Sequence, residues 1–227
     1  MNTSHDRFDL IIRGGTIYDG SGGEPVSADI GVTGDRITAL GDLTEAAAAD
    51  EIDASGMAVA PGFIDVHSHD DFHVLSSPDV EHNVYQGITT VVVGNCGFGA
   101  APYDAAAERQ GELYALPPEV KPWVGYGGYL DTVDRVKPSL NVAALVGHNT
   151  LRVDAMGDIQ QVPPSIDQVT HMAGWVAEGM EAGAVGFSTG LIYEPGRYSE
   201  TDEIAAIATV AGGYGGVCLR HTHAERG

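Results

Sequence analysis

Five short apolar runs rich in β-branched residues follow one another after residue 58, and segments with helix signals separate them. The five runs are Ala58–His69, Gly87–Cys96, Asn141–His148, Ala184–Ser188 and Gly216–His223. Strand signals that alternate with helix signals are typical of βα units, in which successive strands lie parallel in one sheet. This part of the chain is therefore expected to form an α/β domain around a parallel sheet of about five strands.

Three of the separating segments carry signals of helix boundaries. Ser77, followed by proline, resembles a helix start, and Gly87 would end that helix. Ser165 is expected to cap a second helix, whose apolar residues recur at helical spacing and indicate a core-facing side. Thr201 is expected to cap a third helix, which a pair of glycines would end.

Residues 101–138 form an insertion between the second and third runs that is rich in proline, glycine and aromatic residues. Its aromatic residues include Trp123, Tyr126 and Tyr129. An insertion of this length fits two interpretations, a cover over a site or a long surface loop that packs on itself. The sequence leaves both open.

Residues 1–57 have a different character and are expected to form a separate amino-terminal β segment, with the barrel-like part in 58–227. Short strand-like pieces alternate there with turn signals: Phe8–Arg13, Thr16–Asp19, Ala28–Val32 and Arg36–Leu40. The last two flank a Thr-Gly-Asp turn and predict a hairpin. The pattern predicts a small antiparallel sheet, and the alanine-rich stretch Glu45–Asp50 is expected to be a connection.

The first apolar run ends in a His-x-His pair, His67 and His69. Side chains alternate between the two faces of a strand, so these two imidazoles are expected to point to the same side. Two adjacent imidazoles at the end of a buried strand supply two of the ligands that a divalent metal requires. A single histidine is more often a satisfied polar residue, but a pair after Pro-Gly favours a metal site.

The second run ends at Cys96, in a segment that also contains Gly94, Gly97 and Gly99. Thiolate is a strong zinc ligand, and the glycines allow a sharp turn and leave room beside the sulfur. The alternative is that Cys96 is a small buried hydrophobe, the commonest role of a free cysteine. Its position at a strand end, like that of the histidine pair, favours the ligand interpretation.

His148 and His221 also lie where predicted strands end. In a (β/α)8 TIM barrel the carboxyl ends of the strands converge on the face that holds the active site. We therefore expect a partial TIM barrel whose strand ends gather these residues. A metal held there would lower the pKa of a bound water toward about 7 and make hydroxide available at neutral pH.

The composition excludes several classes of partner. The 227 residues carry a net charge of −21 with only 11 lysines and arginines, which argues against nucleic acid and anionic membrane surfaces. The first residues lack the apolar core of a signal peptide, and no run reaches transmembrane length. Two cysteines without an export signal suit a reducing cytoplasm. The sequence leaves the oligomeric state open.

Several motifs carry a resemblance to a known family. Asp9–Gly20 and Pro61–His69 resemble the opening β segment and the first barrel strand of the amidohydrolase superfamily. Gly94–Gly97, Gly147–Arg152 and Gly186–Tyr193 are similar to motifs of its D-aminoacylase, or N-acyl-D-amino-acid deacylase, branch. The resemblance implies a metal-dependent TIM barrel preceded by part of a composite β-sandwich, and the hydrolysis of a small-molecule N-acyl-D-amino acid.

The same resemblance implies a site. The zinc ligands, for one or two Zn2+ ions, would be His67, His69, Cys96 and His221. Tyr193 is implied to lie near the substrate, and Ser188 and His148 are further substrate-binding candidates. The implied mechanism is attack of metal-activated water on the acyl carbonyl, with a carboxylate that accepts the proton and delivers it to the leaving amine. That general acid and base, an aspartate in the family, is expected beyond Gly227, and no catalytic residue is assigned within the chain.

One feature departs from the family pattern, and another helps to choose between branches of the superfamily. Strand five reads His221-Thr222-His223 where the family has an arginine at the third position, so His223 is an alternative ligand to His221. Cyclic-amide hydrolases of the superfamily bridge two metals with a carboxylated lysine on strand four, but the only lysines are Lys121 and Lys137, away from strand ends. This favours the linear-amide branch over a cyclic-amide hydrolase.

Other functions remain as alternatives. Ser188 as a nucleophile is disfavoured because it lacks the Gly-x-Ser-x-Gly elbow. A catalytically silent metal-binding scaffold is the alternative outside enzymes. Because a closed barrel needs eight strands, the 227 residues are expected to be a fragment that aggregates or packs loosely on its own, without deacylase activity.

Overall fold

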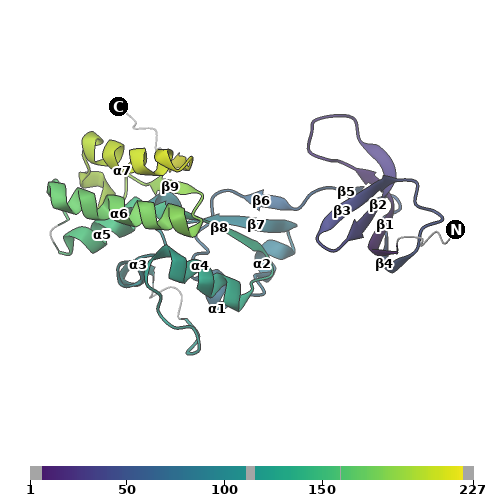
Figure 1. Ribbon diagram of the computed structural model, residues 1–227, viewed down its shortest axis with the longest axis horizontal. Coiled ribbons are helices and arrows are strands. Elements are labelled where there is room, and N and C mark those ends of the chain that lie inside the picture. Colours follow the sequence, from purple (N-terminus) through teal and green to yellow (C-terminus); the bar gives the residue numbers. More distant parts are fainter. Residues whose placement is uncertain (1–6, 111–115, 159, 222–227) are drawn as a thin grey trace. The chain divides into compact units, whose positions relative to one another are not determined.

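The computed structural model describes residues 7–110, 116–158 and 160–221. The chain divides into two compact units, Met1–Gly62 and Phe63–Gly227 (Figure 1). The sequence places the boundary slightly earlier, between residues 57 and 58. The two positions differ because strand β5 (Ala58–Val59), which the sequence assigns to the first barrel strand, pairs with β1 of the first unit.

The first unit is a single five-stranded sheet. Its other strands are β1 (Phe8–Ile17), β2 (Val26–Thr33), β3 (Arg36–Gly41) and β4 (Ala48–Asp53), in the order β3-β2-β1-β4. The predicted hairpin is confirmed, because β2 and β3 are antiparallel and Gly34 adopts the positive φ of +60° that the tight turn requires.

Two expectations for the first unit were wrong. The sheet is mixed rather than antiparallel, because β4 and β5 both run parallel to β1. The alanine-rich stretch Glu45–Asp50 is not simply a connection, since its last residues open β4. Arg13 of β1 reaches across to the Glu51 carboxylate of β4, with Nε at 2.8 Å from Oε2, and this pair adds a cross-strand contact that composition alone does not reveal.

The second unit is built on five parallel strands, as the sequence predicts. They are β6 (Phe63–Asp65), β7 (Ile88–Val93), β8 (Asn141–Gly147), β9 (Gly186–Thr189) and β10 (Val217–Arg220), in the order β10-β9-β8-β7-β6. The central strands carry buried β-branched and aromatic residues such as Val91, Val146 and Phe187. The strands curl into a half-barrel, which confirms the predicted α/β fold and partial TIM barrel.

Helices connect these strands and pack on one another beside the sheet (Figure 1). They are α1 (His73–Ser76), α2 (Glu81–Val84), α3 (Tyr103–Gln110), α4 (Gly125–Val136), α5 (His148–Met156), α6 (Ile166–Ala182) and α7 (Thr201–Gly213), with short 3-10 turns η1 (Asn95–Gly97) and η2 (Gly196–Tyr198). Ser165 caps α6 as expected, in a reciprocal capping box with Gln168. Within the described residues, no helix is long and apolar enough to cross a membrane.

Two expectations about the helices need correction, and one helix was not predicted. The expected helix start at Ser77 was wrong, because Ser77 is the C-terminal cap of α1. Before Gly87 only the single turn α2 follows, and its N-terminal cap, Val80, adopts a left-handed φ of +39°. Thr201 is the first residue of α7, and Glu200 occupies the cap position. Helix α5 was not predicted, because its few apolar residues give no strong helical period.

The aromatic residues of the insertion belong to the core. Trp123, Tyr126 and Tyr129 are buried, and the last two are fully inaccessible. The Tyr129 hydroxyl donates to the backbone carbonyl of Asp71 at 2.9 Å, which ties α4 to the loop that follows β6. These three aromatic residues therefore belong to the core of the second unit and not to a loop that packs only on itself. A cover over the site stays a prediction.

Candidate metal centre

His67 and His69 lie together at the carboxyl end of β6. The strand ends at Asp65, so both histidines belong to the loop that follows it, and strand alternation is not what pairs them. Their ring centroids are nevertheless 5.6 Å apart in an edge-to-face arrangement, and both residues are exposed. The loop brings the two imidazoles to one place, which is the outcome that the sequence predicts by a different route.

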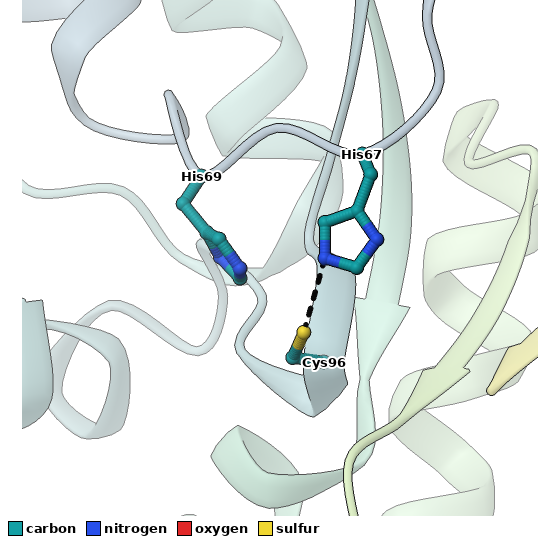
Figure 2. Close-up of side chains that lie close together, drawn as sticks. All are labelled: His67, His69 and Cys96. Atoms are coloured by element: carbon teal, nitrogen blue, oxygen red, sulfur yellow. Dashed lines mark hydrogen bonds between the residues drawn. The ribbon is translucent and has the colours of Figure 1, made fainter. Parts of the chain in front are cut away.

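Cys96 approaches the same place from the end of β7. Its Sγ lies 3.2 Å from Nε2 of His67, the contact drawn as a dashed line in Figure 2. The ligand atoms of His67, His69 and Cys96 all lie within 4.8 Å of one another. Cys96 is itself only 4% exposed, so the thiol lies at the bottom of the cluster and the imidazoles at its rim.

His221 completes the cluster from the far edge of the sheet. It follows β10, and its Nδ1 lies 3.1 Å from the Cys96 Sγ. Its ring centroid is 5.9 Å from that of His67, although β6 and β10 are the two outermost strands. Four strand spacings in a flat sheet would separate those edges by about 19 Å. The curl of the sheet is therefore what brings the fourth ligand candidate to the other three.

The donor set fits a zinc ion. Tetrahedral zinc with bonds of about 2.3 Å to sulfur and 2.0–2.1 Å to nitrogen places these atoms about 3.5 Å apart. The two observed sulfur–nitrogen distances of 3.2 and 3.1 Å are within a few tenths of an ångström of that value. A candidate metal site is thus present, with ligands from three strand ends.

The electrostatics of the cluster favour uncharged side chains. Burial raises the pKa of the Cys96 thiol, and burial together with the neighbouring His67 lowers the pKa of His69. Neutral imidazole is the form that binds a metal, and a coordinated thiol loses its proton to the cation's charge. Residues 222–227, which include the alternative ligand His223, lie outside the described residues.

Tyr193, predicted to lie near the substrate, stands beside this cluster. Its ring centroid is 5.5 Å from that of His221 and 5.5 Å from that of Phe98, and Tyr193 is 37% exposed. Ser188, the second substrate-binding candidate, is fully buried. Its hydroxyl donates to the Gly94 carbonyl and accepts the Gly97 N–H at 3.0 Å. A substrate-binding role stays a prediction for both residues.

His148, the third candidate, is not brought into the metal cluster. It is fully buried, and its Nε2 lies 2.9 Å from the carboxylate of Glu203, which also binds Arg152 through Nη1 at 2.7 and 2.6 Å. Burial lowers the pKa of His148 despite that carboxylate. Burial alone would raise the pKa of Glu203, but His148 and Arg152 hold it below its usual value. A substrate contact of His148 stays a prediction.

Sequence reasoning gave no role to Asp71, which directly follows the histidine segment. The residue is completely buried, and neither carboxylate oxygen has a hydrogen-bond partner among the described residues. Burial raises the pKa of this carboxyl to about 7. The only sequence signal was its position after two histidines and another aspartate, which does not distinguish a buried carboxyl from an exposed one.

Comparisons with known proteins identify the class. A model of the amidohydrolase family matches residues 50–220, so the chain belongs to that family, as its motifs indicate. It is 43% identical over 220 residues to an N-acyl-D-glutamate deacylase and 39% identical over 227 residues to a D-aminoacylase, both from Alcaligenes xylosoxydans xylosoxydans. These matches cover 97% and 96% of this chain but 45% of each relative, so the chain spans about half the length of the curated relatives it matches.

A solved structure of a deacylase also resembles this chain. The N-acyl-D-glutamate deacylase of Bordetella bronchiseptica, complexed with zinc and a phosphonate that mimics the tetrahedral intermediate, matches with a TM-score of 0.85 and 41% identity. The match covers 97% of this chain and 46% of that chain. It shows that a relative with this fold binds zinc.

Proposed function

We propose that this chain carries the metal centre of a zinc-dependent hydrolase that cleaves the amide bond of N-acyl-D-amino acids. The observation that carries the proposal is the convergence of the Cys96 thiol with the imidazoles of His67 and His69 at the carboxyl edge of the half-barrel. The similarity to deacylases of N-acyl-D-glutamate and to a D-aminoacylase supports the substrate class. We infer a reducing cytoplasm as the location, because the proposed ligand is a free thiol.

The residues divide the work of such a site. His67, His69, Cys96 and His221 would hold one or two zinc ions. A zinc ion bound there supplies Lewis acidity toward the acyl carbonyl and lowers the pKa of a bound water toward about 7. Tyr193 lies beside His221, where its exposed ring can contact a bound acyl amino acid. The carboxylate that transfers the proton to the leaving amine is, in this proposal, an aspartate beyond Gly227.

Two alternatives are less well supported. A cyclic-amide hydrolase would need a carboxylated lysine on strand four, and this chain has none there. Lys137 caps the end of α4, and Lys121 precedes that helix. A silent metal-binding scaffold shares the same metal centre, so only turnover separates it from the enzyme. Metal without turnover in the full gene product would support the scaffold.

The experiment measures zinc content and hydrolysis in the full gene product. We expect the unmodified protein to hydrolyse N-acetyl-D-glutamate or another N-acetyl-D-amino acid and to leave the L-enantiomer nearly untouched. Cys96→Ala removes a direct ligand, so it should lose zinc affinity by more than the 10–100-fold that is typical of residues behind the ligands, and activity with it.

The matched control is Cys218→Ala, which removes the other free cysteine, an exposed one. This variant should keep both zinc and turnover. Unchanged zinc content in Cys96→Ala contradicts the metal centre. Equal rates on both enantiomers, or a preference for a cyclic amide, contradicts the substrate class while leaving the metal centre intact.

A further inference from the structure

We propose that Ser188 and Asn149 are positioning residues that hold Cys96 in the backbone conformation that presents its thiol to the metal. Ser188 lies near the end of β9, and Asn149 lies in the first turn of α5, directly after β8. Neither residue is among the ligand candidates. The inference rests on the proposed function only in taking Cys96 as a metal ligand.

Cys96 has an unusual backbone. Its φ of +56° and ψ of +21° are left-handed, and Gly94 and Gly97 on either side also have positive φ angles. Glycine adopts this region freely, but a residue with a side chain is strained there by roughly 1–3 kcal/mol. Such a conformation persists only where the surrounding structure imposes it. The contacts of this loop should therefore include the groups that impose it.

Ser188 bonds the loop on both sides of the cysteine. Its hydroxyl donates to the carbonyl of Gly94 and accepts the N–H of Gly97 at 3.0 Å. The side chain is completely buried, so water cannot replace it when it is removed. One hydroxyl thus fixes the distance between the residue before Asn95 and the residue after Cys96, and with it the tight turn that contains them.

Asn149 holds the cysteine's own peptide group. Its Nδ2 donates to the Cys96 carbonyl at 2.9 Å and to the Gly190 carbonyl at 3.4 Å, from a position with no exposed surface. A Cβ at Gly190 would collide with the same Cys96 carbonyl oxygen, so the end of β9 packs directly against this peptide. The orientation of the peptide sets the direction of the Cα–Cβ bond, and hence the place of Sγ.

These hydrogen bonds are made to the loop that carries the proposed ligand Cys96, and not by the ligand atom itself. A shift of the loop by a few tenths of an ångström would change the distance from Sγ to the nitrogens of His67 and His221, now 3.2 and 3.1 Å. Residues that orient a metal ligand typically contribute 10–100-fold to metal affinity. Ser188 and Asn149 are therefore expected to affect the sulfur–metal bond more than their effect on stability predicts.

The test uses the full gene product with cobalt(II) in place of zinc. The near-ultraviolet absorption from thiolate-to-cobalt charge transfer reports the sulfur–metal bond, and competition with a chromophoric chelator reports zinc affinity. Ser188→Ala and Asn149→Ala should each weaken zinc binding by about 10–100-fold and shift or weaken the charge-transfer band. The matched control is Thr132→Val, which removes a buried hydroxyl that bonds the Gly128 carbonyl within α4.

The control separates positioning from stability. Thr132→Val should lower the thermal midpoint to a similar extent but leave zinc affinity and the cobalt band unchanged. Wild-type affinity and an unchanged band in both Ser188→Ala and Asn149→Ala overturn the proposal, and so does an equal loss of affinity in Thr132→Val. If either test variant does not fold, the other carries the same comparison. Absence of the band in the unmodified protein would instead refute Cys96 as a ligand, and with it the proposed metal centre.

Discussion

Two histidine clusters at the carboxyl edge of the half-barrel have opposite surroundings. In the metal centre, His67 and His69 are exposed and form no ion pair within the described part of the chain. In the second cluster, His148 is fully buried and its imidazole meets the Glu203 carboxylate, which Arg152 also binds. The first cluster offers converging ligand atoms. The second contains a guanidinium bound to its carboxylate. A position at a strand end therefore does not by itself place a histidine among converging ligand atoms.

The largest expected effect tests the second half of this comparison. Glu203→Ala leaves the Arg152 guanidinium buried without its carboxylate, and breaking a buried pair in this way typically costs about 3–5 kcal/mol. We expect denaturant unfolding of Glu203→Ala to show a loss of that size. Zinc content per folded chain should not change, because Glu203 contacts His148 and Arg152 and not the proposed zinc ligands.

The control for that variant is Glu194→Ala, which removes an exposed carboxylate 3.7 Å from the Arg197 guanidinium. Exposed pairs contribute little, so its unfolding midpoint should match that of the unmodified protein. If the unfolding midpoint of Glu203→Ala also matches that of the unmodified protein, the Glu203 carboxylate does not stabilise Arg152 and His148. The proposed difference between the two histidine clusters would then be wrong. Loss of zinc from a well-folded Glu203→Ala variant would also contradict the separation of the clusters.

Asp71 is a second buried carboxyl with which Glu203 can be compared. It follows the histidine segment, and its oxygens lack, among the described residues, the imidazole and guanidinium partners that Glu203 has. Its pKa of about 7 when folded exceeds the value of about 3.9 in an unfolded chain. The folded state therefore holds more protons between these pH values, and stability should fall as the pH rises from about 4 to 7. The corresponding penalty above pH 7 is on the order of 4 kcal/mol at most.

The measurement is the unfolding free energy of Asp71→Asn across this pH range. Asparagine is a neutral isostere of the protonated acid, so the variant should lose the downward slope and be more stable than the unmodified protein at pH 8. Asp79→Asn, at an exposed position, is the control and should keep the slope. An unchanged slope in Asp71→Asn would show that this carboxyl is ionised in the folded protein throughout.

The sequence predicted those parts of the molecule that local patterns determine. The five strands followed from β-branched runs, and the strand ends identified His67, His69, Cys96 and His221 as candidates that the fold brings together. The reason given for the histidine pair was wrong, because the residues lie in a loop and not on a strand. The two rings nevertheless lie together, with their centroids 5.6 Å apart, because the turn after β6 brings them to one place. Their role as metal ligands stays a prediction.

The parts that failed depend on contacts between distant segments. His148 and Glu203 are 55 residues apart and meet because they lie in the first turns of α5 and α7, which the fold brings together. Their pairing, which explains why His148 is not in the metal cluster, cannot be read from either local sequence. Asn149 was quoted within a motif, but its contact with the Cys96 carbonyl spans 53 residues. Residues that support a site are thus harder to predict than the residues that form it.

The smallest expected effect concerns a third histidine, His171 on α6. Its Nε2 lies 2.7 Å from the Asp154 carboxylate, closer than the 2.9 Å between His148 Nε2 and the Glu203 carboxylate. The His171 side chain, however, is 52% exposed. Water can solvate both groups when the pair is broken, so His171→Ala should change the unfolding free energy by no more than about 0.5 kcal/mol. Trp175, whose indole N–H donates to the same carboxylate at 2.8 Å, keeps Asp154 bonded in the variant. Chemical denaturation beside Glu203→Ala makes the comparison direct, because the two variants remove partners at similar distances and differ in burial. A loss of 2 kcal/mol or more in His171→Ala would mean that distance, rather than solvent exclusion, sets the strength of histidine–carboxylate pairs in this protein.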